Sequence, residues 1–154
     1  MKGDVLSKFK TKYCLSFPIG QEFYCDIGNG TRESPYLVYS AESLYDVRND
    51  LNAYYKQICD IDLTGYSSGE GWLPIGNNSN RFTGHFDGGG FVITGLKINR
   101  PESDYIGLFG AISNDAKVTN CKIVDAVTSG SRFVSVLVPF CSSEFCVRII
   151  MLFL

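Results

Sequence analysis

The chain has 154 residues, of which 45% are apolar and 19% are charged, and its formal net charge is −2. These values exclude a globally disordered chain and predict one domain with a moderate core. The charge offers no electrostatic basis for binding nucleic acid or an anionic membrane. Sixteen glycines, nine tyrosines and eleven phenylalanines favour a turn-rich β protein over a helical one.

The first thirty residues contain no recognisable element. Lysines precede an apolar run at 13–19, as in a secretory signal peptide, but Ser16 and Pro18 interrupt the run and it is too short. We therefore identify no signal peptide. Gly28-Asn29-Gly30 is typical of a turn and marks a module boundary. We assign residues 1–30 as a leader of uncertain structure.

A short strand at 36–39 is followed by a helix signal. Ser40 can cap a helix that runs through about Tyr54. Leu44, Val47, Leu51 and Tyr54 then fall on one apolar stripe. We expect this stripe to pack on the protein's own core; the alternative is a helix that binds a partner.

The segment after this helix alternates between apolar and polar residues. Cys59, Ile61 and Leu63 are expected to face the core, and Asp60 and Asp62 the solvent. A polar, glycine-rich loop at 65–71 follows. It predicts an exposed connection that ends where apolar residues return at 72–75.

The most informative stretch is 81–110. Phe82, Gly84 and Phe86 alternate with polar residues, which predicts a strand with one buried face. Asp87-Gly88-Gly89-Gly90 breaks that strand, and Thr94-Gly95 marks a second corner. Short strands separated by tight corners, with no helix between them, indicate a coil of a β-solenoid.

Two internal similarities support a solenoid. The segment 93–98 aligns with 118–123 at an offset of about 25 residues, and 105–110 aligns with 133–138 at about 28, both within the usual range for such repeats. Rungs of this length hold three short strands and their corners. Stacked rungs pair in parallel, and their inward residues form a continuous core.

At Gly107-Leu108-Phe109-Gly110 the chain resembles the GLUG motif, a repeat of bacterial and archaeal surface proteins. The segments 34–38, 60–63, 71–76 and 82–88 are similar to the module that often precedes such repeats. The resemblance implies an all-β, right-handed parallel β-helix in an extracellular or envelope protein, with structural rather than catalytic motif residues.

From the repeats and this resemblance we predict a short β-helix at 31–128, and a degenerate repeat with an apolar tail at 129–154. The helix at 40–54 is expected to cap the first rung. The predicted inward residues are Leu37, Leu44, Leu51, Ile61, Leu63, Phe82, Phe86, Ile93, Leu96, Ile98, Leu108, Val118, Cys121 and Ile123.

Few residues suggest a catalytic or metal-binding role. Asp60 and Asp62 lie two apart on a strand, so their Cα atoms are about 6.6 Å apart. That spacing resembles the acid pair of inverting glycosidases, and together with Asp87 these oxygens could bind calcium. Ordinary solvent exposure explains all three carboxylates better, and we predict no metal site and no cofactor.

Trp72 is the single tryptophan of the sequence, and His85 is the single histidine. Trp72 could stack on a sugar ring, although packing in the first rung is the commoner use of such a residue. We therefore keep Trp72, Asp60, Asp62 and Asp87 as candidate ligand-binding residues. His85 has no second imidazole with which to share a metal, and no nucleophile elbow accompanies it, so we predict no catalytic residue.

Six cysteines permit disulfides without defining them. Cys59 and Cys121 are expected to be buried free thiols, and the pairs Cys14/Cys25 and Cys141/Cys146 could form bridges in an exported protein. The terminal apolar run is too short to cross a bilayer. An open rung edge next to this tail predicts self-association.

Because the repeat explains nearly every notable residue, we expect a non-enzymatic cell-surface or adhesion-type module that binds a glycan or a surface protein. The alternative is a polysaccharide lyase or hydrolase on the same fold. The resemblance implies an extracellular or cell-surface location.

Overall fold

The computed structural model describes residues 27–140 and 147–148. The predicted leader and most of the apolar tail lie outside the described residues. The elements, in chain order, are β1 (Tyr36–Val38), α2 (Ala41–Tyr45), η1 (Asp46–Asn49), β2 (Tyr54–Gln57), β3 (Ile61–Asp62), η2 (Thr64–Tyr66), β4 (His85–Asp87), β5 (Val92–Thr94), β6 (Lys97–Arg100), β7 (Lys117–Thr119), β8 (Lys122–Val124), β9 (Val127–Gly130) and β10 (Val147–Arg148).

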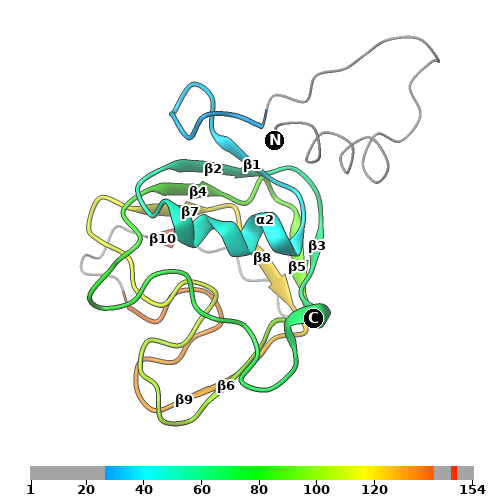
Figure 1. The fold of residues 1–154 in the computed structure, drawn as a ribbon, viewed down its shortest axis with the longest axis vertical. Helices are drawn as coiled ribbons and strands as arrows, with labels where there is room; N and C mark the ends of the chain where they lie inside the picture. Colours follow the sequence, from blue (N-terminus) through cyan, green and yellow to red (C-terminus); the bar gives the residue numbers. More distant parts are fainter. Residues whose placement is uncertain (1–26, 141–146, 149–154) are drawn as a thin grey trace, which may run out of the picture.

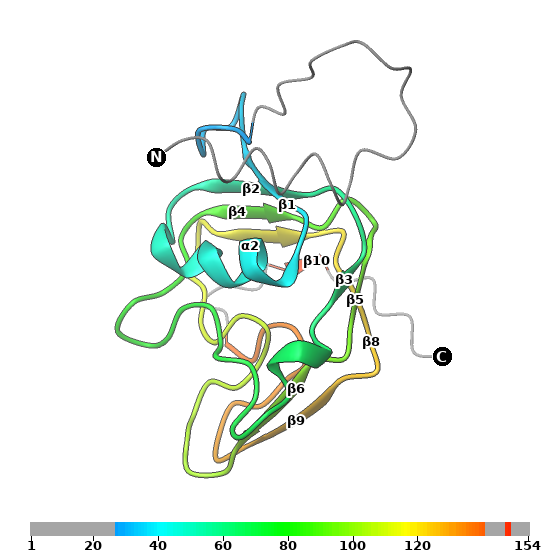
Figure 2. The same cartoon turned by 45° about the vertical axis from the view of Figure 1, so that its right-hand side comes forward.

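The strands form three parallel sheets that make the sides of a coil (Figures 1 and 2). Sheet A has the order β1-β2-β4-β7-β10, sheet B the order β3-β5-β8, and sheet C pairs β6 with β9. The chain visits the three sheets in turn, and each turn lies beside the preceding one in Figure 1. The predicted fold class, a short parallel β-helix with one short helix, is confirmed.

The register gives the length of a rung. Lys97 pairs with Val127 (127 − 97 = 30), and Ile106 pairs with Val134 (134 − 106 = 28). The second offset was predicted. The predicted alignment of 93–98 with 118–123 was wrong, because Ile93 pairs with Ile123 rather than with Val118.

The mistaken alignment has a geometric cause. Segments 93–98 and 118–123 are both strand–corner–strand units, but they lie at different corners of the coil. The chain turns at Gly95 with φ of 69° and at Asn120 with φ of 53°. Glycine and asparagine are the residues that adopt this left-handed conformation most readily. The two sequences are similar because their local turns are similar, although their strands are not paired.

The cap begins at the predicted residue and ends early. Ser40 and Ser43 form a reciprocal capping box at the start of α2. Leu44 in α2 and Val47 in η1 are buried in the core, and α2 contacts β1. The prediction of a helix through Tyr54 was wrong, because the backbone is extended at Asp50.

The core runs through the coil as rows of paired inward residues. Phe86 lies between Tyr55 and Val118 in sheet A, and Phe86 and Phe109 meet edge to face with ring centroids 5.4 Å apart. Eleven of the predicted inward residues are buried. Leu51 and Ile123 are half-buried against the core. The prediction that Leu37 points inward was wrong, since Val38 faces the core instead.

Close packing around the GLUG-like segment explains why it contains glycines. Leu108 and Phe109 are buried, and a Cβ on Gly110 would lie 2.4 Å from the carbonyl oxygen of Gly76. Ile75 pairs with Phe109, so residues 73–76 occupy the corresponding place in the rung before. The next rung continues through Phe140, whose carbonyl accepts from the Ile112 amide. The coil therefore continues into the segment that we assigned to a degenerate repeat, as far as Phe140.

Two of the six cysteines lie in the described part of the chain, and both are free thiols. Cys121 is buried as predicted. Cys59 is only half-buried, and its thiol donates to the Tyr39 carbonyl at 3.0 Å. The other four cysteines, with the two proposed bridges, lie outside the described residues. Among the described residues, no helix is long and apolar enough to cross a membrane.

Candidate functional site

Each of the three candidate carboxylates accepts a hydrogen bond that stabilises a turn of the coil. Asp60 Oδ1 accepts from the Val92 amide at 2.8 Å and so links two rungs. Asp87 Oδ1 accepts from the Gly89 amide at 3.0 Å and from Asn120 Nδ2 at 2.8 Å. Asp62 Oδ1 accepts from the Thr64 amide at 2.9 Å. Hydrogen bonds from Thr64 lower the pKa of this carboxyl, because they favour its charged form.

These carboxylates are not gathered in one place. Asp60 and Asp87 lie at the corner between sheets A and B, whereas Asp62 lies at the other end of β3. In the part of the chain that the structure describes, no group of three or more His, Cys, Asp or Glu side chains is placed to hold a metal ion.

Trp72 is fully buried, with a relative exposure of 0%. Tyr45 and Tyr66 pack edge-on against its ring, and its Nε1 donates to the Leu108 carbonyl at 3.3 Å. This arrangement leaves no ring face for a sugar, so Trp72 serves the packing role that we weighed against ligand binding.

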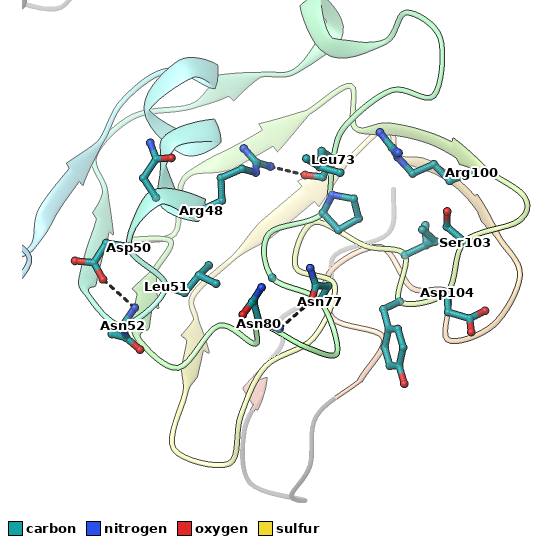
Figure 3. A pocket seen from close by; sticks show the side chains of 15 residues that line it. Arg48, Asp50, Leu51, Asn52, Leu73, Asn77, Asn80, Arg100, Ser103 and Asp104 are labelled. Atoms are coloured by element: carbon teal, nitrogen blue, oxygen red, sulfur yellow. Dashed lines mark hydrogen bonds between the residues drawn. The ribbon is translucent and has the colours of Figure 1, made fainter.

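A different set of residues lines the loop groove, a hollow of about 600 Å³ shown in Figure 3. Three segments from successive levels of the coil build it: 48–52 at the cap, 73–80 in the next rung and 100–106 after β6. The exposed loop that the sequence predicted at 65–71 contributes no residue to the groove, whereas Asn77 and Asn80 line it.

Two arginines fix the upper wall of the loop groove. The guanidinium of Arg48 donates to the carbonyls of Tyr45 and Leu73, and it lies 3.7 Å from the centroid of the Tyr45 ring. Burial lowers the pKa of Arg48, because desolvation disfavours the charged form. Arg100 forms a 2.5 Å ion pair with Glu70. The main role of both arginine side chains is therefore to hold neighbouring loops together.

The other polar side chains of the groove form few hydrogen bonds that link it to the rest of the protein. Asn77 Oδ1 accepts from the Ser79 and Asn80 amides at 2.9 and 2.8 Å, which folds the 77–80 turn. Within the described residues, the side chains of Asn80, Ser103 and Asp104 form no hydrogen bond with the protein. Asp50 and Asp104 lie on opposite sides of the groove in Figure 3. The lining contains two arginines and two aspartates, so it carries no net charge.

Sequence reasoning missed this groove because its residues come from three rungs. The spacing between 48–52, 73–80 and 100–106 becomes meaningful only when the rung length is known. The pairing of Ile75 with Phe109, had it been recognised, would have placed the second and third segments in neighbouring rungs. No pattern in the sequence distinguishes Asp104 or Ser103 from other loop residues.

Two known proteins are similar to this chain. A 100-residue stretch is 48% identical to the "Putative Gly-rich membrane protein" of Evansella cellulosilytica, covering 62% of this chain and 12% of that protein. A 121-residue stretch is 33% identical to halomucin of Haloquadratum walsbyi, covering 71% of this chain and 1% of halomucin.

The chain is therefore homologous to short segments of two much longer proteins, and it spans about an eighth of the first and a hundredth of the second. No protein-family model matches the chain. No solved structure matches it either.

Proposed function

We propose that this chain is a non-enzymatic β-helix module of the GLUG-repeat type in a cell-surface protein, and that its loop groove binds a neutral glycan. The cell-surface location is supported by similarity to a much longer protein whose name describes a membrane protein. The repeat type is supported by the buried Leu108 and Phe109 between two glycines that have no room for a side chain.

The main support for glycan binding is that several polar side chains in the groove form no hydrogen bond with the protein. Asn80, Ser103 and Asp104 offer both donors and acceptors, as a ligand rich in hydroxyl groups requires. The balance of charges in the lining favours a neutral ligand. Tyr105 also lines the groove and supplies an aromatic ring that can pack on the C–H face of a sugar.

A polysaccharide-acting enzyme is the second candidate, because Asp50 and Asp104 both line the groove and lie on opposite sides of it in Figure 3. Two carboxylates across a sugar chain are the minimum for glycoside hydrolysis. Neither aspartate has a histidine beside it in the lining. Apart from these two aspartates, the described lining of the groove contains no His, Cys, Glu or Lys side chain that would favour catalysis over binding.

A glycan array and a hydrolase and lyase screen on the same purified protein test both candidates. We expect binding of a neutral glycan without turnover. Asn80→Ala and Tyr105→Ala should each weaken binding, whereas Asn99→Ala, an exposed asparagine on sheet C, should leave it unchanged.

Turnover of any polysaccharide would overturn the proposal if Asp50→Asn or Asp104→Asn abolished it without loss of folding. The same conclusion would follow if Asp60→Asn or Asp62→Asn abolished turnover. No binding and no turnover would also reject the glycan site and leave a structural repeat.

A further inference from the structure

The outer face of sheet A carries a second set of side chains. Tyr54, His85 and Lys117 are register partners and form one outward row across β2, β4 and β7. Together with Arg32 and Glu33 from the loop before β1, they line a shallow hollow of about 450 Å³. This hollow, here called the sheet A face, shares no lining residue with the loop groove.

An aromatic pair forms the middle of the sheet A face. The rings of Tyr54 and His85 lie with centroids 4.4 Å apart and planes tilted by 30°. Both residues are half-buried, so part of each ring remains open to solvent. At this separation and tilt the two rings stack face to face, as in-register side chains of neighbouring strands can, so the pair offers a sugar the Tyr54 hydroxyl and the imidazole nitrogens rather than a flat aromatic surface.

Unpaired cations surround this aromatic pair. Arg32, Lys56 and Lys117 line the face and make no ion pair within the described residues, where Arg100–Glu70 is the ion pair that the structure contains. Two carboxylates, Glu33 and Asp87, line the same hollow. The face therefore carries a small positive charge, although the whole chain has a net charge of −2.

This charge pattern selects among anionic ligands. A polymer with densely spaced phosphate or sulfate groups would bring negative charge against Glu33 and Asp87, which costs binding energy. A polysaccharide with one carboxylate per sugar has a lower charge density. It can place its carboxylates near the three cations while its hydroxyl groups hydrogen-bond with the Tyr54 hydroxyl and the His85 imidazole.

We propose that the sheet A face binds an acidic polysaccharide of the uronate type. The Tyr54 hydroxyl and the His85 imidazole hydrogen-bond with the sugar hydroxyls, and Arg32 and Lys117 pair with the carboxylates on either side. This site differs from the loop groove in position and in ligand charge, so each can be tested without the other.

His85 provides a direct reporter, because it is the one histidine in the sequence. Burial lowers the pKa of its imidazole, and the nearby charges of Lys117 and Arg32 lower it further. Glu33, Lys56 and Asp87 also line the hollow around it. A bound carboxylate offsets these positive charges, so binding should raise the pKa of His85.

The experiment titrates the His85 ring signals by NMR with oligogalacturonate, a sulfated oligosaccharide and a neutral cello-oligosaccharide as separate probes. We expect oligogalacturonate to raise the pKa of His85 and to bind less tightly as salt increases. Arg32→Ala and Lys117→Ala should each weaken this binding by about fivefold. Lys97→Ala, which removes an exposed charge from sheet C, is the matched control and should leave binding unchanged.

The proposal is overturned if oligogalacturonate leaves the pKa of His85 unchanged. Equal or tighter binding of the sulfated or neutral probe would also overturn it, as would an equal loss of affinity in Lys97→Ala. All three substituted residues are exposed, and circular dichroism before each titration confirms that the variant is folded.

Discussion

Tyr105 stacks on Phe133 in the next rung, with ring centroids 5.0 Å apart and planes within 13° of parallel. Both residues have positive φ, 62° for Tyr105 and 52° for Phe133. Large side chains rarely adopt this left-handed conformation, which costs an L-residue roughly 1–2 kcal/mol. The same strained turn is therefore repeated in two rungs, and stacking of the two rings offsets part of its cost.

This pair predicts an unusual order of stability among variants at position 133. Phe133→Ala loses the ring contact but keeps the strained backbone, and should lower the free energy of unfolding by about 1–2 kcal/mol. Phe133→Gly loses the same contact but relieves the strain, and should be about 1 kcal/mol more stable than Phe133→Ala. Urea denaturation of both variants measures the difference. An alanine variant at least as stable as the glycine variant would contradict the assignment.

The inward face of sheet A can be tested at Phe86, which is 1% exposed. Phe86→Ala should cost about 3–5 kcal/mol in the free energy of unfolding, because it leaves a cavity against Phe109 and Val118. Phe91 is the matched control, since it lies close by in the chain and is 36% exposed. Phe91→Ala should cost less than about 1 kcal/mol. A loss in Phe91→Ala as large as that in Phe86→Ala would contradict the assignment of Phe86 to the inward face.

The GLUG-like segment predicts that Gly110 tolerates no side chain. A Cβ there would lie 2.4 Å from the Gly76 oxygen, whereas a Cβ on Gly65 would meet nothing within 4 Å. Gly110→Ala should therefore destabilise the protein by about 1–3 kcal/mol or more. Gly65→Ala should be neutral or slightly stabilising. Thermal denaturation of the two alanine variants distinguishes a packing role from a role of glycine in general flexibility.

The sequence was sufficient to predict the coil because its corners and strands are local features. Ser40 identified the start of α2, and the alternation of Phe82 and Phe86 identified the inward face. The end of the cap was not predictable in the same way. Tyr54 continues the apolar stripe of a helix, but in the structure it pairs with His85 in sheet A. Pairing with a strand of the next rung, far along the chain, overrides the local helical pattern.

The candidate sites were harder to predict than the fold. Asp60 and Asp87 attracted attention as carboxylates, yet each accepts backbone or amide hydrogen bonds at a corner. Asp104 and His85 line the two hollows and have no distinguishing sequence pattern. Which side chains converge across rungs depends on the register, and an error of a few residues in the offset separates them.

Cys121 predicts how stability changes at alkaline pH. Burial raises the pKa of its thiol to about 12, with a further contribution from the nearby charge of Asp87. Because the folded state disfavours the thiolate, this contribution to stability is complete below the unfolded pKa of about 8.5 and declines as pH rises toward about 12.

We therefore expect Cys121 to resist alkylation by iodoacetamide at about pH 9 in the folded protein and to react in urea. Peptide mapping by mass spectrometry separates it from the other cysteines. Cys121→Ala should show a shallower loss of stability at high pH. Rapid alkylation of Cys121 without urea would contradict its burial.

Self-association remains a prediction, and β9 gives it a testable form. Within the described residues, β9 pairs with β6 on one side only, and Val127 on this strand is 66% exposed. An open edge beside exposed apolar residues favours pairing between chains. Light scattering should show mass that increases with concentration, and Val127→Lys should reduce this increase. A clean monomer at high concentration in the unsubstituted protein would exclude association through this edge.

The parallel register between rungs has a consequence for how such a chain can change its length in evolution. Lys97 and Val127 are register partners one rung apart, and each rung presents to the next the same kind of edge that it received. Duplication of one whole rung would lengthen the coil and keep every corner and inward row in place. Loss of a single residue from a strand would instead turn the following inward side chains to the solvent. Selection should therefore tolerate gain or loss of a whole rung more readily than gain or loss of one residue.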